Sequence, residues 1–203
     1  MESFLQCPDS RHPHLIDLGL SSGTKWACCN VGASKPEEYG GYYAWGVTSQ
    51  VYGSSDYPYF YYDEEGEYQY VNIGNDIAGT IYDAAYVNWG GTWQMPTEDQ
   101  LIELISESSH EWTNIGGVNG YLFTGLNGGK IFLPAAGSTE DHDKPGEDGS
   151  YWSSTLGDSE LKWPSGLFFS VGEGVSNPHP YPGYTPRRYG LSVRAVEGHY
   201  CVL

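Results

Sequence analysis

The segment Pro96-Thr97-Glu98-Asp99-Gln100-Leu101-Ile102-Glu103-Leu104-Ile105 decides the fold class of this 203-residue chain. Thr97 followed three residues later by Gln100 is a capping box, which predicts that a helix begins here. Leu101, Leu104 and Ile105 recur at helical spacing and predict one buried stripe. Because strand patterns dominate the chain outside this helix, we predict an α+β fold.

Strand patterns occur on both sides of the helix. Runs of alternating apolar residues or of β-branched and aromatic residues predict strands at 14–20, 25–31, 112–113, 120–124, 130–133, 151–155, 167–171 and 189–196. The turn residues 21–24 predict a hairpin between the first two strands, and Asn127-Gly128 predicts another hairpin turn. A helical turn capped by Ser34 is expected at 34–39, and a short helix at about 82–86.

Composition and charge narrow the class of partner. The chain has 26 acidic and 9 basic residues, a formal charge of −17, which disfavours a nucleic-acid partner. Aromatic residues make up 15% of the chain, which argues against disorder. No apolar run approaches the roughly 20 residues that span a bilayer, so no membrane insertion is expected. The first seven residues lack the features of a signal peptide.

The four cysteines allow two interpretations. Cys7, Cys28, Cys29 and Cys201 lack the C-x-x-C spacing typical of zinc sites. They are either buried and terminal thiols or include a disulfide between Cys7 and Cys201.

No repeat or linker divides the chain, so we expect an N-terminal extension at 1–13 and a single domain at 14–203. Residues 47–75 form a polar, tyrosine-rich insertion with room for one hairpin.

Eight short segments stand out by their order and spacing. They are LIDLGL (15–20), KWACCNVGA (25–33), EEYGGYYAWG (37–46), WQMPT (93–97), GVNGY (117–121), IFLPAAG (131–137), YWSST (151–155) and RYGLSVR (188–194). Together they resemble the Fibrobacter succinogenes major paralogous domain family, which is common in gut Bacteroidetes. The resemblance runs from about residue 14 to residue 196. The family more often has arginine where this chain has Gln94.

The resemblance implies a C-type-lectin-like fold. That fold is shared with formylglycine-generating-enzyme and sulfatase-modifying domains and with variable proteins of diversity-generating retroelements, including phage receptor-binding tips. It implies a small twisted antiparallel sheet with two helices and long irregular loops, in which the N- and C-terminal strands pair. In the variable proteins the diversified positions lie near the C-terminus, which corresponds here to a ligand-facing region at 150–196.

The residues do not indicate an enzyme. The formylglycine-generating branch relies on a reactive cysteine pair near its C-terminal region, where this chain has only Cys201. The six histidines show no metal-binding helix spacing, and no G-x-S-x-G motif or phosphate loop occurs. We therefore assign no catalytic and no metal-ligating residues.

Calcium is the one cofactor left open. Residues 140–149 concentrate carboxylates in a loop, as a calcium site would. An EF-hand alignment of this loop fails, because it puts Pro145 and Trp152 where ligands are needed. The sequence favours a solvated acidic turn over a calcium site, and hence no cofactor.

Two late segments carry the candidate ligand-binding residues. Aromatic residues there lie among prolines and glycines with no strand periodicity, an arrangement that supplies contact area at low entropy cost. The alternative is that these aromatic side chains simply pack against the body of the domain. The candidate residues are Glu160, Lys162, Trp163, Ser176, Asn177, His179, Tyr181 and Tyr184.

The sequence therefore favours a non-enzymatic ligand-binding or receptor-recognition domain. It would be a retroelement variable protein or a surface or phage adhesin that binds a cell-surface protein or glycan through late aromatic loops. The insertion at 47–75 is a second candidate contributor. An extracellular, cell-surface or virion-associated location is expected. Two alternatives stay open: a structural module of a bacterial surface assembly, and a catalytic relative of the formylglycine-generating enzyme.

Overall fold

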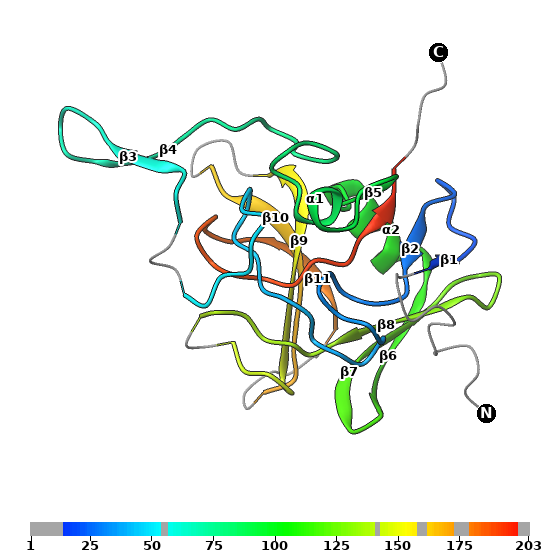
Figure 1. Ribbon diagram of the computed structural model, residues 1–203. Coiled ribbons are helices and arrows are strands. Elements are labelled where there is room, and N and C mark those ends of the chain that lie inside the picture. Colours follow the sequence, from blue (N-terminus) through cyan, green and yellow to red (C-terminus); the bar gives the residue numbers. More distant parts are fainter. Residues whose placement is uncertain (1–13, 54–56, 141–142, 158–161, 173–178, 199–203) are drawn as a thin grey trace, which may run out of the picture.

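The chain folds into a strand-rich α+β structure (Figure 1). The computed structural model describes residues 14–53, 57–140, 143–157, 162–172 and 179–198. The N-terminal extension, Cys7 and Cys201 therefore lie outside the described residues. Within the described ranges the helices are α1 (Ala84–Trp89) and α2 (Glu98–Glu107), and the strands are β1 (Leu15–Asp17), β2 (Lys25–Ala27), β3 (Phe60–Tyr62), β4 (Tyr68–Tyr70), β5 (Trp93–Gln94), β6 (Ser109–Ile115), β7 (Val118–Thr124), β8 (Lys130–Pro134), β9 (Asp148–Leu156), β10 (Pro164–Ser170), β11 (Tyr181–Tyr184) and β12 (Val196–Glu197).

Both predicted helices are confirmed. The Thr97 hydroxyl accepts the Gln100 N–H (3.3 Å) and the Gln100 side-chain oxygen accepts the Thr97 N–H (2.9 Å), which is the predicted capping box of α2. Leu101 and Leu104 bury its apolar stripe. The helix α1 is capped by the buried Asp83.

The helical turn expected at 34–39 is wrong. The segment makes turns and bends without a helix. The Ser34 N–H and hydroxyl both donate to the Glu38 carboxylate, at 2.7 and 3.0 Å. Ser34 is therefore a donor to a nearby side chain and not a helix cap.

The strands are antiparallel, as expected, but they are divided among four small sheets. The sheet orders are β1-β2-β12-β5, β11-β10-β9, β3-β4 and β6-β7-β8. The predicted hairpin of β1 with β2 is confirmed, and β12 pairs with β2, so the first and last described strands share one sheet.

Most of the strand predicted at 189–196 is instead a connecting segment that bonds to two other parts of the chain. Its backbone bonds alternately to the N-terminal region and to β9. Val193 O accepts Val31 N–H (2.9 Å), while Ser192 N–H donates to Ser150 O (3.0 Å) and Ser192 O accepts Trp152 N–H (3.0 Å). This alternation replaces a continuous ladder, and only Val196–Glu197 remains a named strand.

Buried aromatic side chains and two buried arginines, Arg187 and Arg194, fill the centre of the fold. Trp26, Trp45 and Trp152 are fully buried, which agrees with their expected place in the body, whereas Trp93 is half-buried. Arg194 is also fully buried. Its guanidinium donates to the Asn30 side-chain oxygen (2.9 Å) and to the carbonyls of Ala27 (3.3 Å) and Phe132 (2.8 Å).

Buried phenols make the fold sensitive to alkali. Tyr43, Tyr57 and Tyr151 are almost completely buried, and burial raises the pKa of each phenol above its ordinary value. The folded chain therefore keeps these protons above about pH 10, where the unfolded chain loses them. We expect the free energy of unfolding to fall as pH rises beyond that point, by up to about 1.4 kcal/mol per pH unit for each phenol.

Denaturant titrations across this range measure the effect, with phenolate absorbance as a second signal. Tyr151→Phe removes one of the three titrating groups and should make the fall less steep. Ionisation of all tyrosines before the fold is lost would contradict the prediction.

Candidate functional site

The candidate site is built on strand β11, at the edge of the β11-β10-β9 sheet. Tyr184 lies opposite Ser165 of β10, and Tyr181 opposite Phe168. The sequence interpretation of this segment as an aperiodic loop is wrong. Pro182 argues against a strand in the sequence. A proline is nevertheless tolerated in an edge strand, because no neighbouring strand has to accept a hydrogen bond from its missing N–H.

Two paired glycines make room for an aromatic ring beneath β11. Gly166 and Gly183 lie opposite each other in the ladder. A Cβ atom added to either would come within about 3.1 Å of the Phe168 ring. The Phe168 ring therefore lies across these glycines, with its centroid 6.1 Å from that of Tyr181.

Tyr184 is held by a third glycine. A Cβ atom at Gly157 would lie 2.1 Å from the Tyr184 ring, so only glycine fits beneath it. The Gly157 N–H donates to the Trp163 carbonyl (3.1 Å), which fixes this glycine at the end of β9. Tyr184 is still 50% exposed and Tyr181 47% exposed, so each ring is supported on one side and open on the other.

These rings border a groove of about 320 Å³, which is within the size range of small-ligand sites. Carboxylates of the 140–149 loop form part of its wall. The Asp143 carboxylate accepts the Ser150 hydroxyl (2.8 Å), which orients it. The lining combines apolar ring faces with hydroxyl and carboxylate acceptors; it comprises Ser138, Glu140, Asp143, Phe168, Tyr181, Gly183, Tyr184, Thr185, Tyr189 and Leu191.

The acidic wall also acts on the groove phenol. Partial burial raises the pKa of Tyr181, and the negative charges of Asp143 and Asp148 raise it further. Tyr181 is therefore a neutral phenol at physiological pH, able to donate one hydrogen bond and accept others. With these acidic acceptors beside it, the groove suits a ligand rich in hydrogen-bond donors.

The candidate residues named from sequence divide into three groups. Tyr181 and Tyr184 line the groove. Lys162, Trp163 and His179 are described but are not among its lining residues: Lys162 and His179 are exposed and Trp163 is half-buried. Glu160, Ser176 and Asn177 lie outside the described residues.

Sequence reasoning missed the other walls of the groove. Phe168 was included in a predicted strand without a role, although alternation carries a signal: Leu167 and Phe169 are buried and Phe168 between them is half-buried. The sequence places Glu140 and Asp143 in a solvated acidic turn or a calcium loop, and not in the ligand site. Their approach to β11 depends on tertiary packing that no local pattern encodes.

Two carboxylates of the 140–149 loop, those of Asp143 and Asp148, accept local hydrogen bonds. Asp148 accepts the Lys144 N–H (2.7 Å), in addition to the Asp143 contact with Ser150. Among the described residues, which omit 141–142, no group of three or more His, Cys, Asp or Glu side chains is placed to hold a metal ion.

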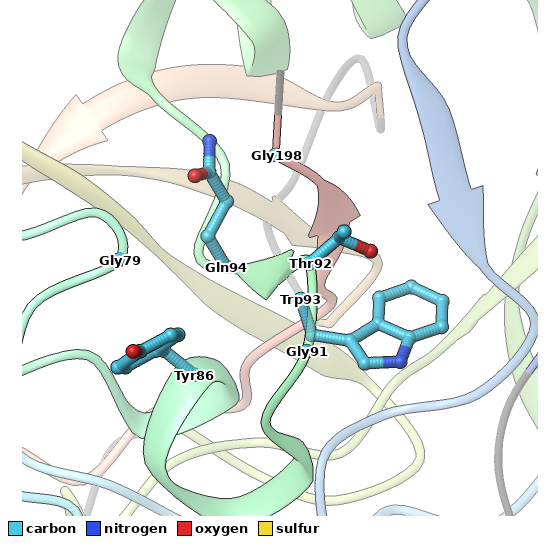
Figure 2. Close-up of a pocket in the computed structure, with 7 residues that line it drawn as sticks. All are labelled: Gly79, Tyr86, Gly91, Thr92, Trp93, Gln94 and Gly198. Atoms are coloured by element: carbon cyan, nitrogen blue, oxygen red, sulfur yellow. The ribbon is translucent and has the colours of Figure 1, made fainter. Parts of the chain in front are cut away.

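A second, smaller hollow of about 190 Å³ lies between α1, β5 and Gly198. Figure 2 shows the side chains of Tyr86, Trp93 and Gln94 pointing in three different directions around it. A small-molecule site normally has convergent polar groups. The groove beside β11 is therefore the better candidate.

No protein-family model, curated protein or solved structure matches the chain. In the part of the chain that the structure describes, none of the helices has the length and apolar character needed to cross a membrane. The site is accordingly interpreted from its own geometry.

Proposed function

We propose that this chain is a non-enzymatic recognition domain that binds a protein or glycan on a cell surface through the groove beside β11. The observation that carries the proposal is the half-exposed pair Tyr181 and Tyr184 at the rim of that groove, with the Tyr184 ring over Gly157 and the Tyr181 ring beside Phe168. Pre-oriented rings lose little entropy on binding, and they offer both apolar faces and hydroxyl groups to a ligand.

We also propose that the domain has the C-type-lectin-like fold. Support comes from the presence of the first and last described strands in one antiparallel sheet, from the two helices, and from the long irregular connections between strands. On this view the groove occupies the ligand-facing region expected at 150–196. The chain would then be a retroelement variable protein or a surface or phage adhesin, acting outside the cell or on a virion, without a cofactor.

Exposure of the β11 rings favours recognition over a purely structural module. A structural role for the late aromatic residues calls for their burial against the body. Trp163 is half-buried, which fits either role, but Tyr181 and Tyr184 each leave about half of their surface open.

The catalytic alternative finds little support in the cysteines. A formylglycine-generating relative needs a reactive cysteine pair in a cleft. Cys28 and Cys29 are buried, and the small cavity beside Cys28 has a volume of only about 10 Å³. Cys201, the late cysteine, lies outside the described residues.

Arrays of glycans and of cell-surface proteins test the proposed function. We expect the chain to bind at least one ligand, and Tyr181→Ser with Tyr184→Ser to weaken that binding by about ten-fold or more. The matched control is Tyr86→Ser, which removes a tyrosine that is 38% exposed and lies outside both the groove and the insertion at 47–75. Undiminished binding by the double variant would refute the groove as the contact surface.

Two further arms separate the alternatives. Repeating the array with added calcium and with a chelator tests the cofactor, and loss of binding in chelator that added calcium restores would show that binding needs calcium. Neighbouring DNA tests the variable-protein class. A reverse transcriptase gene and a template repeat matching the codons for residues 150–195 are expected for that class.

A further inference from the structure

The hairpin formed by β3 and β4 extends away from the rest of the described chain (Figure 1, cyan). Its register pairs Phe60 with Tyr70 and Tyr62 with Tyr68. Residues that face each other across strands, and residues two apart along one strand, share a face of the sheet. Four aromatic side chains therefore lie on one face of the hairpin.

These four rings contact one another in a continuous row. Phe60 and Tyr68 stack at 5.0 Å with only 13° between their planes, and Tyr62 and Tyr70 stand nearly perpendicular to Tyr68 at 6.1 and 5.1 Å. The row stays accessible, since Tyr62 is 65% exposed. Exposed contiguous aromatic surface of this kind is typical of interaction sites.

The hairpin is anchored and does not hang freely. The Arg187 guanidinium lies 4.8 Å from the Tyr70 ring and donates to the Val71 carbonyl (3.1 Å). Arg187 is itself buried. At the other end Asp63 closes the turn, because its carboxylate accepts the Glu67 N–H (2.8 Å) and the Gln69 side-chain amide (2.9 Å).

Both outer edges of the hairpin present backbone groups. Val71 N–H donates to Tyr59 O (2.9 Å) and Asp63 N–H to Glu67 O (3.0 Å), so these two pairs are hydrogen-bonded pairs. Bonded and non-bonded pairs alternate in an antiparallel ladder. The backbone groups of the four aromatic residues therefore point outward. Within the described residues β3 and β4 pair only with each other, so these edges can accept another strand.

The hairpin is strongly acidic. Residues 60–70 contain four Asp or Glu residues and no Lys or Arg. Three of the carboxylates, those of Glu64, Glu65 and Glu67, are on exposed residues at the turn. The charge of this segment selects a partner of opposite sign.

We propose that the β3–β4 hairpin is a docking site for an extended, basic segment of a partner protein, which adds a strand to one edge of the hairpin. Main-chain hydrogen bonds would hold the added strand. Its lysine or arginine side chains would lay their aliphatic stems and charges against the aromatic row and reach the carboxylates at the turn.

A polypeptide fits these features better than a glycan. The outward backbone groups match the main chain of another strand in spacing and in polarity. An acidic glycan would be repelled by the four carboxylates, and a neutral glycan would leave them without a counter-charge. The aromatic row of the hairpin shares no residue with the lining of the groove, and this proposal does not rest on the function proposed for the groove.

Binding of a short labelled peptide of alternating lysine and valine to the whole chain tests this proposal. We expect saturable, salt-sensitive binding, measured by fluorescence anisotropy, and slower hydrogen exchange at the amides of Phe60 and Tyr62 or of Tyr68 and Tyr70. The same peptide with every residue N-methylated has no main-chain donors for the ladder and should bind about ten-fold more weakly.

Matched variants separate the hairpin from general charge attraction. Glu64→Gln with Glu65→Gln should weaken peptide binding and reduce its salt dependence. Asp99→Asn with Glu111→Gln removes the same charge from exposed sites elsewhere. This control variant should change neither the affinity for the peptide nor its salt dependence. Tyr62→Ser with Tyr68→Ser should weaken binding about ten-fold, with near-ultraviolet circular dichroism confirming an unchanged core.

Several results would overturn the proposal. If both charge variants lose affinity equally, peptide binding is non-specific charge attraction. If the hairpin variants keep their affinity, the hairpin is not the peptide-binding site. Hairpin-dependent capture of a glycan but not of the peptide would assign the surface to sugars. Hairpin-dependent self-association would assign it to a second copy of the chain. Tyr181→Ser with Tyr184→Ser should leave peptide binding intact, so this test and that of the groove fail separately.

Discussion

Replacing Arg194 by methionine is expected to lower the free energy of unfolding by about 3 kcal/mol or more. The guanidinium is the only donor that the structure shows joining Asn30, Ala27 and Phe132, three acceptors from separate parts of the chain. Methionine fills most of the volume but donates nothing. The loss then comes from buried acceptors left without partners, at about 1–3 kcal/mol each.

Denaturant titration of the two proteins measures this loss. Arg194→Lys is the informative control, because lysine keeps the charge but lacks the planar fork that reaches three acceptors. We expect Arg194→Lys to be destabilised as well, since a single ammonium group cannot reproduce the geometry. Wild-type stability in Arg194→Met would show that the three contacts contribute little and that packing alone holds this region.

Replacing Arg187 by methionine is expected to have the second largest effect, about 2–4 kcal/mol. Its guanidinium lies 4.8 Å from the ring centroids of both Trp45 and Tyr70. It also donates to the carbonyls of Lys162 (2.8 Å) and Val71. One side chain thus fastens the hairpin base and the start of the β10 region to the core, so its loss should loosen both.

The neighbouring Arg188 supplies the control. It is half-buried, lies 4.9 Å from the Tyr189 ring and donates to the Tyr189 hydroxyl (3.2 Å), so Arg188→Met removes the same charge with fewer contacts. Limited proteolysis at the hairpin turn, combined with denaturant titration, distinguishes the two variants. Faster cleavage and lower stability in Arg187→Met alone would match the expectation, and equal behaviour of the two variants would contradict it.

Local signals in the sequence predicted the helices and most strands. The capping box of Thr97 and Gln100 involves only nearby residues, so it could be predicted without knowing the rest of the fold. The β1–β2 hairpin followed from a similar short-range pattern. The Ser34 segment shows the limit of such reasoning. The Glu38 carboxylate accepts hydrogen bonds from the N–H and hydroxyl of Ser34, and the predicted helical turn does not form.

The site could be predicted only in part, because its walls come from distant segments. The sequence identifies Tyr181 and Tyr184 as candidates because the segment around them is rich in proline and glycine. Their ordering depends on Gly183, Gly166 and Gly157, whose role as ring supports follows from cross-strand register. The two buried arginines could not be told apart from surface arginines by sequence, since only the assembled core supplies their acceptors.

The position of β12 has a consequence for the synthesis of this protein. The last described strand is an internal member of its sheet, between β2 and β5. A nascent chain can pair β1 with β2 early, but the gap beside β2 stays open until the residues around Val196 have left the ribosome. Closing it joins segments far apart in sequence, which is a slow kind of folding step. Until then the facing edges of β2 and β5 are exposed and open to mispairing.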